Sequence, residues 1–207
     1  MKNHGTTISQ ITGIYAEFQA AIMEALPRDI DQDVALGWTK NGKVLTRVLR
    51  ETLVPSSTPI TATTYHLTVN YERSVEDMVR AGRYNHINSD ITSKHFPTKR
   101  KGVAEVEVEL IHFNWGVCVW TDETLRELDR MGYRPAELHE LLAFGEKYPE
   151  IQLKFPVAAI GSVWRGGSGG YYAPHLWKND LDLERALIIS LIEDGWSKNC
   201  RFAAARK

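Results

Sequence analysis

The fold of this chain is decided by its residues 155–207. They read FPVAAIGSVW (155–164), RGGSGG (165–170), YYAPHLW (171–177), KNDLDLE (178–184), RALIISLI (185–192), EDGW (193–196) and, after three further residues, CRFAAARK (200–207). Apolar and aromatic segments alternate with turn-forming segments at short intervals, which is typical of antiparallel strands joined in a meander. The stretch therefore predicts a scaffold, and it contains no recognisable chemistry.

The N-terminal region is helical by its spacing. Apolar residues at steps of three and four predict a helix that begins near Thr7 and ends before Pro27, with one stripe made of Ile8, Ile11, Tyr15, Phe18, Ile22 and Leu26. Packing of this stripe within the chain is favoured over a coiled coil, because coiled coils usually sustain several heptads. A short helix capped by Asp29 or Asp31 is expected next, ending at Trp38.

A third helix is expected after the Asn41-Gly42 turn. Its inner face is predicted to carry Val44, Leu45, Val48, Leu49 and Leu53. Residues 54–64, VPSSTPITATT, hold two prolines among serines and threonines and read as a linker. The predicted organisation is thus a helical unit over 1–53, a linker over 54–64 and a larger domain over 65–207.

The larger domain is predicted to be α+β. Residues 65–71 and 103–113 alternate with a period of two and are expected to be strands, the second with its glutamates on an exposed face. A short helix capped by Ser74, with Gly82 just after its end, separates them, which is compatible with a parallel βαβ pair. Helices opened by Thr121 and Pro135 precede the meander. The order β-α-β-α-α-β-β-β-β favours helices on one face of a mostly antiparallel sheet.

Several segments of the domain resemble a known group of sequences. TVNYERSVEDMVRAGRYNHINSDIT (68–92), VEVELIHF (106–113), LDRMGYRPAELHELLAFGEKYPE (128–150), FPVAAIGSVW (155–164) and the terminal RFAAARK (201–207) resemble a recurring family of uncharacterised bacterial proteins, and WTKNGKVLTRVLRETL (38–53) is similar to an N-terminal portion seen with them. The resemblance implies that 65–207 is one unit. It implies nothing about activity, cofactor or functional residues.

Composition narrows the class of protein. The 25 Lys and Arg balance 26 Asp and Glu, which argues against bulk attraction to nucleic acid or membranes. The hydrophobic fraction of 43% is enough for a real core. Two cysteines without a spaced framework suit a reducing compartment. The N-terminus carries no secretory signal and the longest apolar run, 186–192, is too short for a bilayer, so a cytoplasmic protein is expected.

No catalytic, metal or cofactor site is predicted. Glu105, Glu107 and Glu109 lie about 7 Å apart along a strand, too far to converge on one small ion. The seven histidines lack zinc-motif spacing, and the loop Gly166–Gly170 precedes a strand rather than the helix that a phosphate loop needs, so it is interpreted as a hairpin loop. Cys200 beside Lys198 and Arg201 favours a thiolate, and a dyad with His175 is left open.

Two surfaces are candidates for binding. The first consists of the aromatic residues of the meander, Trp164, Tyr171, Tyr172, Trp177 and Trp196. Stacking on a ligand or partner is the functional interpretation, and core packing, which is favoured, is the structural one. The second consists of Lys40, Lys43, Arg47 and Arg50, on and just before the third helix. A short helix and a turn precede this helix, and the arrangement weakly resembles a helix-turn-helix motif.

These observations favour a non-enzymatic, intracellular binding or regulatory module that engages a protein partner. The alternatives are a nucleic-acid-binding protein that uses the basic helix 43–53, and a small enzyme with a site at the strand ends that draws on His112, His175, Cys200 or the glutamates. Whether the chain is an enzyme is left open, with the balance toward no. The oligomeric state is open.

Overall fold

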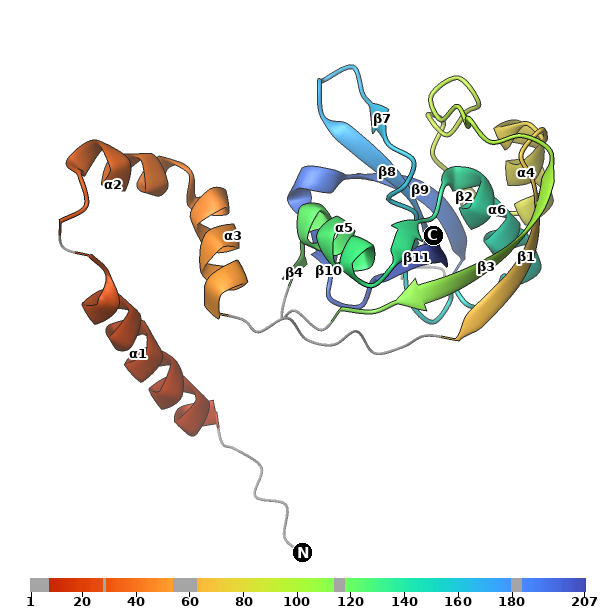
Figure 1. Cartoon of the computed structure of the whole chain (residues 1–207). Helices are drawn as coiled ribbons and strands as arrows, with labels where there is room; N and C mark the ends of the chain where they lie inside the picture. The colour runs from red at the N-terminus through yellow and green to blue at the C-terminus, as the bar shows by residue number, and fades with distance from the viewer. Residues whose placement is uncertain (1–7, 28, 54–62, 114–117, 180–183) are drawn as a thin grey trace, which may run out of the picture. The chain divides into compact units, whose positions relative to one another are not determined.

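The computed structural model describes residues 8–27, 29–53, 63–113, 118–179 and 184–207 (Figure 1). The chain divides into two units, Met1–Pro55 and Ser56–Lys207. Most of the linker predicted over 54–64 lies outside the described residues. Each of the described helices is too short or too polar to cross a lipid bilayer.

The N-terminal unit contains three helices, α1 (Ile8–Ala25), α2 (Gln32–Lys40) and α3 (Gly42–Leu53). Of the two caps proposed for α2, the structure selects Asp31, whose carboxylate accepts a hydrogen bond from the Asp33 N–H at 2.8 Å. Asn41 ends α2, its N–H donating to the Gly37 carbonyl. The three helices that the spacing predicted are confirmed.

The second unit is an α+β structure built on a large mixed sheet. Its strands are β1 (Thr64–Asn70), β2 (His86–Ile87), β3 (Val103–Ile111), β5 (Tyr133–Pro135), β6 (Val157–Ala158), β7 (Trp164–Arg165), β8 (Tyr171–Lys178), β9 (Arg185–Leu191) and β11 (Arg201–Arg206). Their order is β1-β3-β11-β6-β8-β9-β2, with β5 paired to β11 and β7 paired to β8. A small antiparallel sheet joins β4 (Cys118–Val119) to β10 (Trp196–Ser197).

The first two long strands correct one prediction. β1 and β3 pair antiparallel, with Asn70 opposite Val103, so the expected parallel βαβ pair is wrong. The Tyr71 N–H donates to the Gly102 carbonyl at 2.9 Å, which closes the pair at the point where the chain leaves and returns. The intervening segment, which contains α4 (Val75–Gly82) and β2, is therefore an excursion inserted into a wide hairpin rather than a crossover.

The C-terminal strands β6, β7, β8 and β9 pair antiparallel, as the sequence of residues 155–207 predicts. β6 with β8 and β8 with β9 pair antiparallel, and β7 and β8 form a hairpin in which the Gly166 N–H donates to the Gly170 carbonyl at 2.9 Å. The glycine loop is thus a hairpin loop, as expected. β11 then returns to the middle of the sheet, antiparallel to β3 and parallel to β6.

Both faces of the sheet are buried, which corrects the expectation of helices on one face. Neighbouring residues of a strand point to opposite faces. Leu110 and Ala203 belong to the core cluster that contains α4 and α6 (Leu138–Lys147), whereas Ile111 and Phe202 belong to a second cluster that includes Leu128 of α5 (Thr121–Arg130). Residues 202–205 of β11 allow this because all four are apolar and leave no polar face to keep in water.

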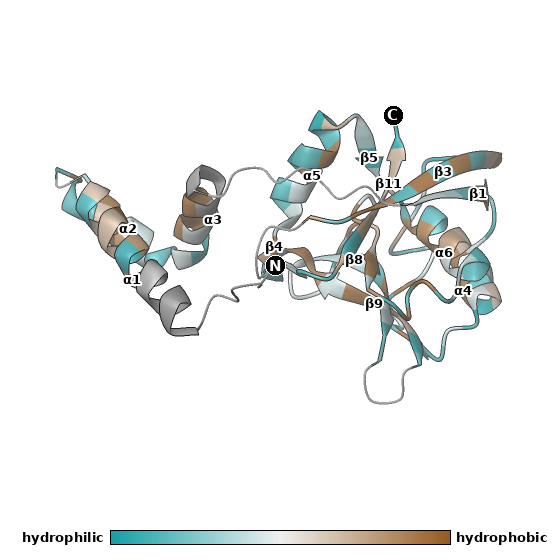
Figure 2. Ribbon diagram, turned by 90° about the horizontal axis from the view of Figure 1, so that it is seen from below, coloured by the Kyte–Doolittle hydropathy of each residue, from teal (hydrophilic) through white to brown (hydrophobic). Residues whose placement is uncertain are grey.

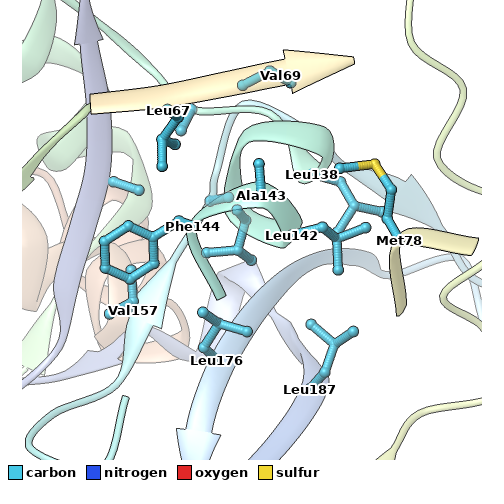
Figure 3. Packing of buried hydrophobic residues seen from close by; sticks show 14 of the residues in the cluster. Leu67, Val69, Met78, Leu138, Leu142, Ala143, Phe144, Val157, Leu176 and Leu187 are labelled. Carbon is cyan, nitrogen blue, oxygen red and sulfur yellow. The ribbon is translucent and has the colours of Figure 1, made fainter. Parts of the chain in front are cut away.

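The sheet curves around α6. Figure 3 shows Phe144 and Leu142 of this helix between Leu67 on β1 and Leu176 on β8, and all four side chains are fully buried. The N-terminus of α6 also departs from expectation, since Pro135 lies in β5 and the cap is Glu137. A capping box explains the later start, because the Glu137 N–H donates to Glu140 Oε2 at 2.8 Å.

Arg185 on β9 ties the two helices of the first core to the sheet. Its guanidinium donates to the carbonyls of Gly82 and Gly145, each at 2.6 Å, in the last turns of α4 and α6. A cation at a helix C-terminus is favourable because it meets the negative end of the helix dipole. Gly82 ends α4 rather than following it, and a Cβ there would lie 2.3 Å from the ring of Tyr84. Arg83 takes the left-handed conformation instead, with φ of 51°.

Candidate functional site

The N-terminal unit exposes an unusual amount of apolar surface. No side chain described in residues 16–49 is buried. Eight of the fourteen large hydrophobic residues exposed in the described chain lie there, and we call them the helical surface: Phe18, Met23, Leu26, Ile30, Val34, Leu36, Val44 and Val48. Figure 2 shows brown and teal residues mixed on α2 and α3. Exposed apolar patches are typical of interaction surfaces in soluble proteins, which makes the helical surface a candidate site.

Part of the predicted stripe is exposed within its own unit, and its packing within the chain stays a prediction. Phe18 and Leu26 are 47% and 44% exposed, and Met23 beside them is 70% exposed. On α3, Val44 and Val48 are exposed although they were assigned to an inner face. Leu45 and Leu49 of the same predicted face are half-buried, so among the side chains described in this unit the apolar side of the helices is covered only in part.

The basic residues of the nucleic-acid hypothesis lie in the same unit. Lys40 is the last residue of α2, and Lys43 lies in the first turn of α3; both are exposed. The side chains of Arg47 and Arg50 lie outside the described part of the chain. The hypothesis consequently stays a prediction.

The five meander aromatics do not form one surface. Trp164 packs against Tyr172, with ring centroids 5.8 Å apart, and Tyr171 is exposed beside them under the Arg165 guanidinium. Trp196 lies in the second core, where its Nε1–H donates to Thr121 Oγ1 at 2.9 Å. Trp177 lies near the far end of β8 and is half-buried.

Three of the aromatic rings of this unit, those of His95, Phe96 and Trp164, form a smaller patch. The His95 ring stacks on the Trp164 indole at 4.4 Å and 13°, and Phe96 packs beside them. His95 Nδ1 lies 2.9 Å from the Asp90 carbonyl oxygen, which fixes the ring. Sequence reasoning missed His95 because its partner is nearly seventy positions away and no local motif marks it. Phe96 is buried and the rings of His95 and Trp164 are half-buried, so little of this patch is free to bind a ligand.

A polar cleft lies along the N-terminal half of β3, where that strand has no partner on the side of β11. Its volume is about 630 Å³, and its lining includes Tyr71, Arg100, Arg134 and Arg206. Glu140, fully buried on α6, accepts hydrogen bonds from both terminal nitrogens of Arg134, at 2.9 and 2.6 Å, and from the Tyr71 hydroxyl at 2.7 Å.

The electrostatics of this network follow from burial and pairing. Burial tends to raise the pKa of the Glu140 carboxyl, but the hydrogen bonds from Arg134, Tyr71 and the Glu137 N–H outweigh it and lower that pKa. Burial, with the hydrogen bond to Glu140, raises the pKa of the Tyr71 hydroxyl. Glu140 is thus ionised and Tyr71 is neutral across the physiological range.

A similar arrangement of tyrosine, glutamate and arginine includes Arg206, which also lines the cleft. Glu109 accepts a hydrogen bond from the Tyr133 hydroxyl at 2.6 Å and pairs with Arg206 at 3.5 Å. Burial, with that hydrogen bond, raises the pKa of Tyr133 to about 12. Glu109 is buried, so the prediction of an exposed glutamate face holds only for Glu105 and Glu107.

The cleft is built for stability rather than for binding an anion. Arg100 donates to Glu137 Oε1 at 2.9 Å, Arg134 is held in a bidentate pair by Glu140, and Lys207 pairs with Asp129. Cations whose donors are already engaged by carboxylates offer little to a negatively charged ligand. No local pattern in the sequence predicts the network, because Tyr71 and Glu140 are 69 positions apart.

The strand-end residues considered for an enzyme do not assemble into a reactive pair. Burial raises the pKa of the Cys200 thiol to about 12, which argues against the thiolate considered from the sequence. Burial also lowers the pKa of His175 to about 4, and its buried Nδ1 has no hydrogen-bond partner. His112 lies within hydrogen-bond distance of the Lys198 carbonyl at 2.9 Å. Within the described ranges no three His, Cys, Asp or Glu side chains are placed to hold a metal ion.

Comparison with known proteins adds no relative. No protein-family model, no curated protein and no solved structure matches this chain. The resemblance described from the sequence therefore stays an expectation, and the function has to be argued from the surfaces themselves.

Proposed function

We propose that this chain is an intracellular, non-enzymatic binding module that engages a protein partner through the helical surface of its N-terminal unit. The observation that carries the proposal is the contrast between the exposed Phe18, Met23 and Leu26 and the absence of any buried side chain among those described around them. Apolar side chains at helical spacing gain free energy only when something covers them, about 25 cal/mol per Å² removed from water.

Two further observations support a binding role over the alternatives. Cys200 and His175, the two residues considered for a nucleophile pair, are buried and held in unreactive states. Both cysteines are free, which suits the reducing interior of a cell. The α+β unit then serves as the stable body that carries the binding unit.

Site-specific photocrosslinking in cells tests the proposal. A photoreactive amino acid at Met23, which is 70% exposed, is expected to form adducts with protein. The same probe at Glu107, exposed on β3 of the other unit, is the matched control and is expected to form none. Adding Phe18→Glu to the Met23 probe is expected to abolish the adducts, since a charge in the apolar face opposes burial.

The outcomes separate the candidate functions. Protein adducts that depend on Phe18 support a partner-binding role. Adducts to nucleic acid, lost on reversing Lys40 and Lys43, would replace the proposal with the nucleic-acid hypothesis. A probe at Met23 that yields no adduct under conditions where Glu107 also yields none would reject the helical surface as a binding site.

A further inference from the structure

We propose that the partner of the helical surface is a second copy of this chain, docked antiparallel around a two-fold axis. This inference rests on the proposed function and names its partner. Three properties of the N-terminal unit support it: the distribution of its charges, the neutrality of the α1 stripe and the area of its exposed apolar surface.

The charges of the unit are separated into two halves. Residues 8–33 carry five acidic residues, Glu17, Glu24, Asp29, Asp31 and Asp33, and one basic residue, Arg28, a net charge of 1 − 5 = −4. Residues 40–51 carry four basic residues, Lys40, Lys43, Arg47 and Arg50, and one acidic residue, Glu51, a net charge of 4 − 1 = +3. The unit is therefore complementary to itself when it is reversed.

Two-fold symmetry uses this separation. In an isologous interface the same patch meets itself, so residue i of one copy contacts residue j of the other and the reverse. An antiparallel arrangement places each acidic half against the basic half of the other copy, whereas a parallel one places like charges together. Complementary potentials favour the first and disfavour the second.

The stripe on α1 has no like charges beside it. At 100° per residue, Glu17 and Glu24 lie on the side of α1 opposite Phe18 and Ile22, and Gln19 on the flank is neutral. The apolar side of α1 can therefore lie against the basic half of the second copy without a like charge inside the contact. The two glutamates stay in water and add to the negative potential of the acidic half.

The apolar area is of the size that association needs. From their fractional exposures, the eight residues of the helical surface together expose on the order of 700 Å². A stable protein interface buries about 800 Å² on each partner. A single helix packed on one neighbouring helix would cover only part of this surface, and a second copy with three helices of its own can cover more.

Sedimentation equilibrium of the full chain tests the inference. The measured mass is expected to rise with concentration from the monomer value of 23.5 kDa to about 47 kDa. Phe18→Glu is expected to weaken association at least tenfold. Ala20→Glu places the same charge on the opposite side of α1 and is expected to leave the association constant within about twofold.

A double variant outside α1 provides an independent test if Phe18→Glu perturbs the structure of α1. Lys40→Glu combined with Lys43→Glu is expected to weaken association about tenfold at low salt, and the difference from the wild type is expected to shrink as salt screens the charges. The urea unfolding transition of the α+β unit is expected to be unchanged in all these variants.

The outcomes distinguish this inference from the proposed function. A chain that stays at 23.5 kDa at every concentration while the Met23 probe captures a different protein overturns the second-copy inference and leaves the proposed function standing. A monomeric chain with no adducts rejects both. A dimer that Phe18→Glu and the double lysine reversal leave intact also overturns the inference, because it must use another surface.

Discussion

The two units of this chain use the same kinds of residue in opposite ways. In the α+β unit, aliphatic and aromatic side chains fill two cores on the two faces of one sheet, and the first contains a helix enclosed by strands. In the N-terminal unit, apolar residues follow an equally regular period, yet none of those described is buried. The period of a sequence therefore identifies the apolar side of a helix without saying whether the same chain covers it.

The largest expected effect tests this contrast with one residue type in both units. Phe144→Ala removes a fully buried ring from the first core and is expected to lower the free energy of unfolding by about 3–5 kcal/mol. Phe18→Ala is expected to change the unfolding of the α+β unit by no more than about 0.5 kcal/mol. Urea titrations followed by tryptophan fluorescence measure both. Comparable losses of stability would mean that Phe18 is packed, and the two units would then not differ in how they use apolar residues.

The next effect concerns a charge that only a unit with a core can bury. Glu140→Gln leaves the Arg134 guanidinium without the carboxylate that neutralises it, and it is expected to cost about 3 kcal/mol. Glu140→Gln with Arg134→Gln, measured in a double-mutant cycle, is expected to cost less than the sum of the single changes. Additive costs would show that there is no coupling energy between Glu140 and Arg134.

The pH dependence of stability is expected to reside in the same unit. The pKa of His175 is about 4 in the folded chain and 6.5 when unfolded, because burial disfavours the charged ring. The unfolded state therefore binds the proton first, and stability is expected to fall by about 2 kcal/mol as the pH falls from 7 to 5. His175→Phe is expected to reduce this slope in urea titrations at several pH values. Burial also lowers the pKa of His139, so part of the slope is expected to persist.

The smallest effect is expected on the exposed part of the sheet. Glu107→Gln breaks a contact of 3.4 Å with His66, in which both side chains are more than half exposed. Such pairs contribute about 0–1 kcal/mol, so the expected loss is less than about 0.5 kcal/mol. Thermal unfolding at low and high salt measures it. A loss as large as that of Glu140→Gln would remove the distinction between the buried and exposed glutamates.

Local patterns predicted the elements of this molecule well and their pairing less well. The period-two stretches became β1 and β3, and the glycine loop became the hairpin between β7 and β8, since these signals depend on neighbouring residues. The antiparallel pairing of β1 with β3 was missed because the excursion between them looks like a crossover in the sequence. A wide hairpin and a parallel crossover differ only in the end of β1 beside which β3 begins, and the sequence between them does not specify that end.

Candidate sites were harder to predict than elements. Trp196 and Tyr171 look alike as aromatic residues of the C-terminal segment, yet one is in a core and the other is exposed. The network of Tyr71, Arg134 and Glu140 depends on contacts between residues far apart in the chain, and no local spacing encodes it. The apolar stripe of α1 was found, but its spacing does not say whether the other helices of its unit cover it.

The position of β11 bears on how the chain is synthesised. Residues 201–206 lie in the interior of the sheet, between β3 and β6 and alongside β5. β11 has to emerge from the ribosome before the two halves of the sheet can join, so until then β3 has an unpaired edge on the side of β11. Throughout that interval the nascent chain already displays α1 to α3, and folding of the α+β unit therefore competes with encounters made by neighbouring nascent chains.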